Sequence, residues 1–129
     1  MVYLDEKVIQ QLVEAFNRRE LEPVTKLFSD DVVLHYPGRN RIAGDYEGKL
    51  GLLELWRKQI ELTGESFQGK VAAVCQGEEN LVLIMDIVVE HDNQEYTWRR
   101  INHYHLAKGR IFEGWIYEGD QYTADIVFA

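Results

Sequence analysis

The sequence predicts an α+β fold, with helices packed on one face of a curved, mostly antiparallel sheet. Two observations support this prediction. Apolar residues at helical spacing dominate the first half of the chain, and strand-like alternation dominates the second half. Helices followed by a run of strands are typical of α+β domains. The 129 residues suit a single domain, residues 1–129, with a buried core.

Three helices are predicted, over residues 5–19, 22–29 and 49–62. Each segment gathers apolar side chains on one face. Asp5 is of a type that caps helix N-termini, and Gly64 is of a type that follows helix C-termini. Three such helices over a concave sheet would enclose a cone-shaped cavity, the kind of site that binds small molecules.

Five strands are predicted, over residues 32–36, 66–76, 81–91, 95–107 and 110–118. Turn-forming residues separate the last four, so these strands are expected to pair as antiparallel hairpins. The tightest turn is expected at Lys108-Gly109, and residues 37–48 are expected to form a loop. The tail, residues 119–129, is expected to pack back over an opening.

The strand at 95–107 is predicted to form the wall of a pocket, because its side chains alternate between two distinct surfaces. One face carries Trp98, Arg100, Asn102, Tyr104 and Leu106. The opposite face carries Thr97, Arg99, Ile101, His103 and His105. A strand that only filled a core would not need arginine, asparagine and histidine at its centre.

Charge and cysteine content exclude several classes of partner. The net charge of −8 disfavours nucleic acid and anionic membranes, which both bind positive surfaces. Cys75 is the one cysteine, so no disulfide can form within the chain, and a reducing cytoplasm is the expected location.

The N-terminus shows no signal peptide, and the longest apolar run, residues 81–85, is too short to span a bilayer. Glycine-rich nucleotide-binding motifs are missing, and we expect no cofactor.

Four ordered segments carry a resemblance to a known superfamily. They are LFSDDVVLHYPG (27–38), AGDYEGKLGLLELW (43–56), HLAKGRIFEGW (105–115) and WIYEGDQYTADIVF (115–128). In this order they resemble the nuclear-transport-factor-2-like superfamily, a cystatin-like α+β cone, and within it the polyketide-cyclase-like (SnoaL-like) branch. The superfamily includes isomerases, cyclases, epoxide hydrolases, dehydratases and proteins without catalytic activity. The resemblance therefore implies the fold and a pocket, and it does not imply one reaction.

Three ionisable residues are candidates for acid/base catalysis: His35, Asp86 and Asp120. The resemblance implies a polar pocket residue at His35, where a neutral imidazole could serve as general base. The alternative is a buried histidine bonded to the backbone. The resemblance also implies an acid/base carboxylate near Asp120, for which the alternative is a strand-end turn residue or a cap for the tail.

Asp86 is a candidate because it interrupts the apolar run LVLIMDIVV. A carboxylate in such a run must be paired, hydrogen-bonded or protonated. One interpretation is a catalytic carboxyl with a pKa raised towards neutrality. The other is a structural ion pair with Arg99 or Arg100 on the next strand.

Seven residues are candidates for binding a substrate. Five of them are aromatic and would favour a flat, hydrophobic molecule: Trp56, Trp98, Tyr104, Trp115 and Tyr117. The alternative for each ring is a place in the core. Arg100 and Asn102 could hydrogen-bond a carbonyl or stabilise an enolate.

His103 and His105 are expected on the outside of the sheet or at a subunit interface. The His-x-His spacing puts both rings on one side of a strand, as in some metal sites. No third ligand lies at a nearby spacing, so no metal is predicted.

Two classes of function remain. The first is a cofactor-independent isomerase, cyclase or hydrolase that acts on a hydrophobic carbonyl compound. The alternative is a non-catalytic domain for hydrophobic-ligand binding or dimeric assembly. A homodimer through the outer sheet face is expected from the residues there, among them Thr97 and Ile101, and is also implied by the resemblance.

Overall fold

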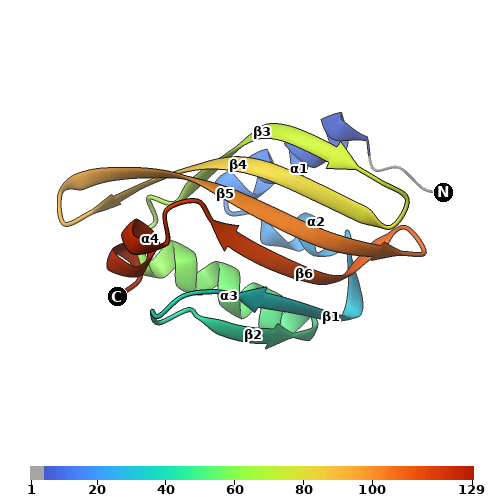
Figure 1. The fold of residues 1–129 in the computed structure, drawn as a ribbon, viewed down its shortest axis with the longest axis horizontal. Helices are drawn as coiled ribbons and strands as arrows, with labels where there is room; N and C mark the ends of the chain where they lie inside the picture. Colours follow the sequence, from blue (N-terminus) through green and yellow to red (C-terminus); the bar gives the residue numbers. More distant parts are fainter. Residues whose placement is uncertain (1–4) are drawn as a thin grey trace.

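The computed structural model describes residues 5–129, and its centre is a six-stranded sheet. Three helices lie on one face of the sheet: α1 (Glu6–Asn17), α2 (Leu21–Thr25) and α3 (Gly48–Leu62) (Figure 1). The strands are β1 (Phe28–Tyr36), β2 (Gly44–Glu47), β3 (Gln68–Gln76), β4 (Asn80–His91), β5 (Gln94–Ala107) and β6 (Arg110–Glu118). Helix α4 (Gln121–Val127) follows the last strand. The predicted α+β architecture is confirmed.

The strands lie in the order β2-β1-β6-β5-β4-β3. Neighbouring strands are antiparallel except β1 and β6, which are parallel. Two elements differ from the prediction: β2 lies in the expected loop at 37–48, and α4 lies in the tail. Strand β1 also begins earlier than expected, at Phe28, so α2 is shorter than predicted. Within residues 5–129, none of the helices combines the length and apolar character needed to cross a membrane.

Two tight turns set the pairing of the long strands. Lys108 and Gly109 join β5 to β6, and both have positive φ, 53° and 75°. Asp92 and Asn93 join β4 to β5 with φ of 51° and 63°. Positive φ at both central residues is what a two-residue type I′ hairpin requires. The predicted turn at Lys108-Gly109 is therefore confirmed.

An extra residue interrupts the pairing of β5 with β6. Leu106 pairs with Ile111, as expected close to a two-residue turn. The next pair is His105 with Glu113, so Phe112 is the extra residue on β6. Beyond this bulge the register differs by one residue from that of a regular hairpin. A shift of one residue exchanges the two faces of a strand.

The bulge decides which β6 side chains point towards the helices. Ile116 is buried there, and a Cβ added to Gly114 would lie 2.6 Å from the ring of Tyr104. Trp115 and Tyr117 point to the opposite face, where Tyr117 is 53% exposed. The inner face of β6 therefore carries Gly114, Ile116 and Glu118, and the large aromatic side chains lie on its outer face.

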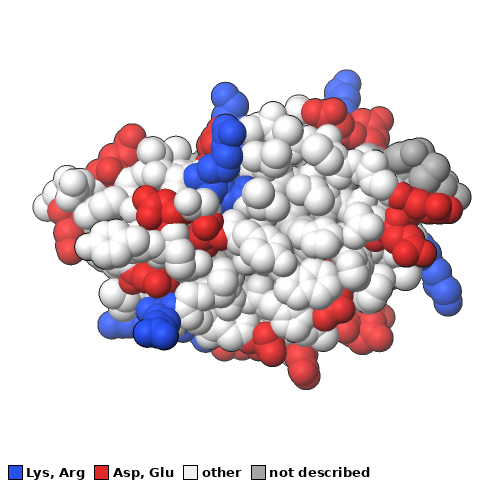
Figure 2. Space-filling view, in the orientation of Figure 1, with Lys and Arg blue, Asp and Glu red and all other residues white. Residues whose placement is uncertain are grey.

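The outer face of the sheet, opposite the helices, is seen in Figure 2. Apolar side chains are partly exposed on it, with Ile101, Phe112 and Tyr117 at 39%, 38% and 53%. Uncharged side chains fill much of the middle of this view, and charged ones lie mostly near its border (Figure 2). A centre with few charges is notable in a chain with a net charge of −8.

Candidate ligand-binding site

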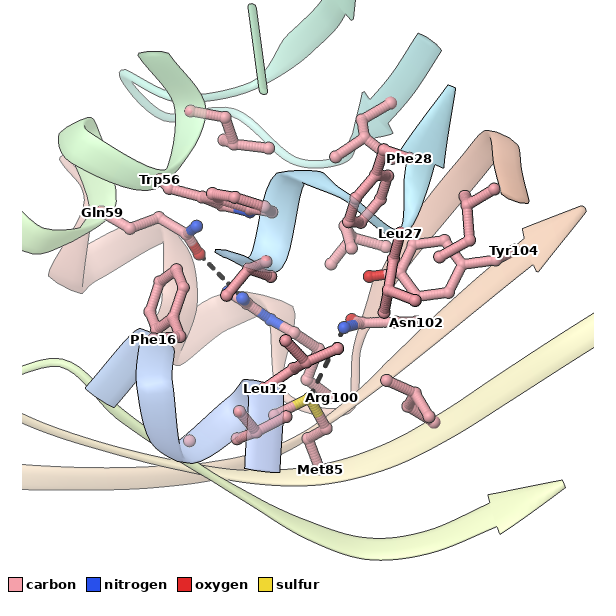
Figure 3. A pocket seen from close by; sticks show the side chains of 18 of the residues that line it. Leu12, Phe16, Leu27, Phe28, Trp56, Gln59, Met85, Arg100, Asn102 and Tyr104 are labelled. Atoms are coloured by element: carbon pink, nitrogen blue, oxygen red, sulfur yellow. Dashed lines mark hydrogen bonds between the residues drawn. The ribbon is translucent and has the colours of Figure 1, made fainter. Parts of the chain in front are cut away.

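A cavity of about 100 Å³ lies between the inner face of the sheet and helices α1, α2 and α3 (Figure 3). Most of its walls are apolar. Helix α1 contributes Ile9, Leu12, Val13 and Phe16, strand β4 contributes Leu81, Leu83, Met85 and Ile87, and Trp56 comes from α3. The sequence builds this lining by helical spacing on α1 and by alternation on β4.

Helix α1 is tied over the cavity by a side chain at its C-terminal end. The Asn17 amide donates from Nδ2 to the Gly69 carbonyl at 2.8 Å, and its Oδ1 accepts from the Gly69 N–H at 3.0 Å. Gly69 lies on β3, an edge strand of the sheet, so the amide acts as a short extension of the strand pairing.

The polar part of the cavity wall comes mainly from alternate residues of β5. Arg100, Asn102 and Tyr104 all line the cavity and are 5%, 9% and 7% exposed. Gln59 on α3 and Tyr36 on β1 add two further polar side chains. An apolar cavity with a few convergent polar groups is the usual form of a small-molecule site.

The Arg100 guanidinium is held by four hydrogen bonds. Nε and Nη2 donate to the two carboxylate oxygens of Glu118 at 2.6 and 2.9 Å. Nη1 donates to Gln59 Oε1 at 2.7 Å, and Nη2 also donates to the Tyr36 hydroxyl at 3.1 Å. The Tyr36 hydroxyl in turn donates to Glu118 at 2.6 Å. Among residues 5–129, these bonds use four of the five N–H groups of the guanidinium and leave one on Nη1.

The electrostatics of this network fix the protonation states. Burial disfavours the ionised Glu118 carboxyl, but the Arg100 charge and the bonds from Arg100 and Tyr36 outweigh it and lower the pKa of Glu118. Burial also disfavours the charged guanidinium, but Glu118 outweighs that effect and raises the pKa of Arg100. Burial raises the pKa of Tyr104 to about 12, against the opposing charge of Arg100. The wall therefore presents a cation, a neutral amide and a neutral phenol.

Glu118, Tyr36 and Gln59 were missed as site residues in the sequence. Glu118 pairs directly with Arg100 across β5 and β6, but only in the register that the bulge at Phe112 creates. Tyr36 could have been found, because it alternates on β1 with buried residues of the inner face. Nothing in the helical pattern separates Gln59 from an ordinary polar residue.

His35 was expected in the pocket, and the structure places it on the outer face of the sheet. Its Nδ1 lies 2.7 Å from Asp45 Oδ1, and its Nε2 lies 2.7 Å from Glu113 Oε2. The ring stacks on Trp115 at 5.5 Å. The physical reason is alternation on β1, which sends Leu34 and Tyr36 inward and His35 outward.

Asp86 and Asp120 also lie outside the cavity. Asp86 is on the outer face, where it pairs with Arg99 at 3.1 Å, and both side chains are about half exposed or more. This is the ion-pair interpretation, with Arg99 as the partner. Asp120 caps α4 by accepting from the Thr123 N–H at 3.0 Å, which is the capping interpretation. The three proposed acid/base groups are therefore not brought together.

The candidate binding residues divide into two groups. Trp56, Arg100, Asn102 and Tyr104 line the cavity. Trp98 is buried but packs edge-to-face on Phe128 instead of lining the cavity. Trp115 and Tyr117 were expected in the pocket and lie on the outer face, because the β6 bulge reverses their direction.

His103 and His105 lie on the outer face, as expected. Both rings contact Trp115, at 5.5 and 4.8 Å between centroids. Across residues 5–129, no group of three or more histidine, cysteine, aspartate or glutamate side chains has the arrangement of a metal site.

Comparisons with solved structures agree with this fold. Bal32a, from a soil-derived mobile gene cassette, superposes with a TM-score of 0.87 at 22% identity, covering 95% of each chain. TerC, co-crystallised with polyporic acid, gives 0.81 at 12% identity over 96% of this chain and 97% of TerC. IdmH, a putative polyketide cyclase from Streptomyces antibioticus, gives 0.71 at 20% identity over 93% and 96%. No curated protein matches the chain.

The family is shown by a sequence model that covers most of the chain. The model of the SnoaL-like domain matches residues 9–114, which include most of α1, all of α2 and α3, the cavity wall on β5 and the first half of β6. These are also the elements that build the cone of the nuclear-transport-factor-2-like fold seen in the similar structures. The chain belongs to the SnoaL-like domain family.

Proposed function

We propose that this chain binds a small hydrophobic molecule with an oxygen-bearing head group in the cavity between sheet and helices. The supporting observation is the contrast between apolar walls and a single polar strand, where Arg100 and Asn102 are buried beside the cavity. The apolar part of a ligand would gain by burial, and the polar strand would orient its oxygen.

The size of the cavity limits the ligand. About 100 Å³ is less than the roughly 150 Å³ of an engineered apolar cavity that binds benzene. A molecule built on one ring is therefore the largest that this arrangement favours. Larger ligands would displace the partly exposed side chains Leu12, Val13 and Phe16 on α1.

Cofactor-independent acid/base chemistry on a carbonyl compound, as an isomerase, cyclase or hydrolase, is the second candidate function. The free N–H of Arg100 could stabilise negative charge that develops on a carbonyl oxygen. However, none of the described residues that line the cavity is a histidine, aspartate or glutamate. Glu118 is held by Arg100 with a lowered pKa, which makes it a weak base. Binding without turnover is therefore our first proposal.

Filling the cavity tests this proposal. Leu83→Phe adds bulk on the inner face of β4, and Ile84→Phe adds the same ring on the outer face one residue later. We expect cyclohexanone to bind wild type and Ile84→Phe with similar affinity by calorimetry, and to bind Leu83→Phe at least about tenfold more weakly. Equal binding of cyclohexanone to all three proteins would overturn the proposal.

We also propose that two copies of the chain associate through the outer sheet face. A separate proposal is that the chain resides in the cytoplasm. The dimer is supported by exposed Ile101, Phe112 and Tyr117 and by a centre with few charges, which limits repulsion between two anionic copies (Figure 2). The single cysteine supports the location. Sedimentation velocity should give a dimer for wild type and a monomer for Ile101→Glu. A monomeric wild type would contradict the dimer.

A further inference from the structure

The Asn102 side chain has an unsatisfied acceptor in the cavity wall. The residue is 9% exposed, and among the described residues no donor bonds to its Oδ1, which is itself buried. Buried polar atoms are nearly always hydrogen-bonded, and an unpaired one destabilises the fold. An orphaned acceptor beside a cavity therefore points to a group that the cavity receives.

The neighbours of Asn102 explain why its Oδ1 lacks a partner among the described residues. Directly across the sheet it faces Leu83 on β4 and Ile116 on β6, and both are aliphatic. On its own strand, Arg100 directs its bonds to Glu118, Gln59 and Tyr36. The Tyr104 hydroxyl, two residues along the same strand, accepts from the Asn102 amide. Among the described residues, the protein therefore supplies polar contacts for the amide nitrogen and no donor for its oxygen.

The direction of the amide follows from its other contact. Asn102 Nδ2 lies 3.5 Å from Met85 Sδ, a weak acceptor (Figure 3). Exchanging oxygen and nitrogen would place Oδ1 against the sulfur, which has no proton to donate. The orientation that places Nδ2 next to the Met85 sulfur is therefore favoured. The atom left without a partner among the described residues is then the acceptor Oδ1.

We propose that the ligand carries a hydroxyl group, as a phenol or cyclic alcohol, that donates its proton to Asn102 Oδ1. This inference rests on the proposed binding function and narrows its ligand class. A ketone, ether or ester has no proton to donate and leaves Oδ1 unsatisfied. Sites that hydrogen-bond a hydroxyl discriminate strongly against analogues without it, because the buried polar group is then left unpaired.

Two matched pairs of probes test the inference in wild-type protein: cyclohexanol against cyclohexanone, and phenol against toluene. Each pair has nearly the same size. Hydrophobicity alone favours toluene over phenol, so the donor effect predicts the opposite order. We expect calorimetry to show cyclohexanol and phenol binding more tightly than their partners, by up to about tenfold.

The variant Asn102→Leu identifies the residue responsible, because leucine has a similar size and no polar atom. We expect the hydroxyl preference to disappear in this variant, with toluene binding more tightly than phenol. A retained preference for phenol would contradict the role of Asn102. The wild-type comparison decides the ligand class even where the variant fails to fold.

The outcomes separate this inference from the proposed function. If toluene and cyclohexanone bind wild type as tightly as their hydroxyl partners, the cavity is a binding site but the hydroxyl inference is wrong. If none of the four probes binds, the proposed function itself is wrong. Hydroxyl preference together with its loss in Asn102→Leu supports both.

Discussion

Arg100 and Glu118 lie directly opposite each other on β5 and β6, and their side chains form a buried ion pair with an Nε–Oε1 distance of 2.6 Å. The Glu118 side chain is fully buried and that of Arg100 is 6% exposed. Next to Arg100, Arg99 pairs with Asp86 across β5 and β4 in the same manner, but on the outer face. The three neighbouring strands β4, β5 and β6 therefore carry two cross-strand ion pairs, one buried and one exposed to solvent.

Removing the charge of Glu118 should strongly destabilise the protein. In Glu118→Gln, the Arg100 guanidinium would remain buried without a counter-charge. Loss of one partner of a buried ion pair costs about 3–5 kcal/mol of unfolding free energy. Urea denaturation at pH 7 measures this change.

The matched control is Asp86→Asn, which removes the carboxylate of the exposed pair. Exposed pairs contribute about 0–1 kcal/mol, because water and salt screen both charges. Equal losses in the two variants would mean that the Arg100–Glu118 pair is not shielded from solvent.

The contribution of Glu118 should depend on pH in the acid range. Burial opposes its ionisation, but Arg100 prevails and lowers the pKa of the folded carboxyl. Its stabilising effect is therefore complete above the unfolded pKa of about 4.3 and is lost as the pH falls through the lower folded pKa. The difference in unfolding free energy between wild type and Glu118→Gln should be constant from pH 7 to 5 and shrink below pH 4. A difference that grows on acidification would contradict this sign.

The contribution of His35 to the free energy of unfolding should show the opposite pH dependence. Its hydrogen bond with Glu113 is the largest cause of a raised pKa, burial opposes the rise, and Asp45 adds to it. The stabilisation is therefore complete below the unfolded pKa of about 6.5 and is lost as the pH rises through the raised folded pKa. Wild type should exceed His35→Gln in stability most at pH 5.5 and least at pH 8.5.

A titration of the imidazole by NMR gives an independent check on His35. Glu113→Gln removes the largest cause and should lower the pKa of His35 relative to wild type. An unchanged imidazole pKa in this variant would show that Glu113 does not hold the ring.

Gly114→Ala should test the register that the bulge imposes. A Cβ at this position would lie 2.6 Å from Tyr104 Cδ1 and 2.7 Å from Leu34 Cδ2, too close for any real contact. Overpacking of this kind costs about 1–3 kcal/mol. Gly77→Ala is the control, because nothing lies within 4 Å of its added Cβ, and it should change stability by less than about 0.5 kcal/mol. A neutral Gly114→Ala would contradict the inward direction of this residue.

The fold was predictable because periodicity and turn chemistry agree along most of the chain. The alternation of β5 identified Arg100, Asn102 and Tyr104 on one inner face, and all three line the cavity. Lys108 and Gly109 marked the turn because few residue types tolerate two positive φ angles in succession.

The site was predicted only in part, because the bulge at Phe112 decides which side chains of β6 point inward. A regular hairpin would pair Trp115 with Asn102 and place Trp115 inward. With Phe112 inserted, Asn102 pairs with Ile116, and Glu118 becomes the partner of Arg100. No local signal in the sequence marks this insertion, because Phe112 differs little from its neighbours as a strand residue.

The predicted acid/base set was misplaced for a related reason. Alternation shows which residues share a face, but it does not show which face turns inward. His35 and Asp86 each lie on a strand among apolar residues and could have faced either way. Only the packing of α1 and α3 on the sheet assigns the inner face.

The most direct test of ligand binding in the cavity is a set of intermolecular nuclear Overhauser effects from phenol to labelled methyl groups. Met85 lines the cavity on the inner face, and Ile101 is exposed on the outer face. We predict effects from the phenol ring protons to the Met85 methyl and none to the Ile101 methyls. Effects to Ile101 without any to Met85 would place the ligand on the outer face and contradict our central claim.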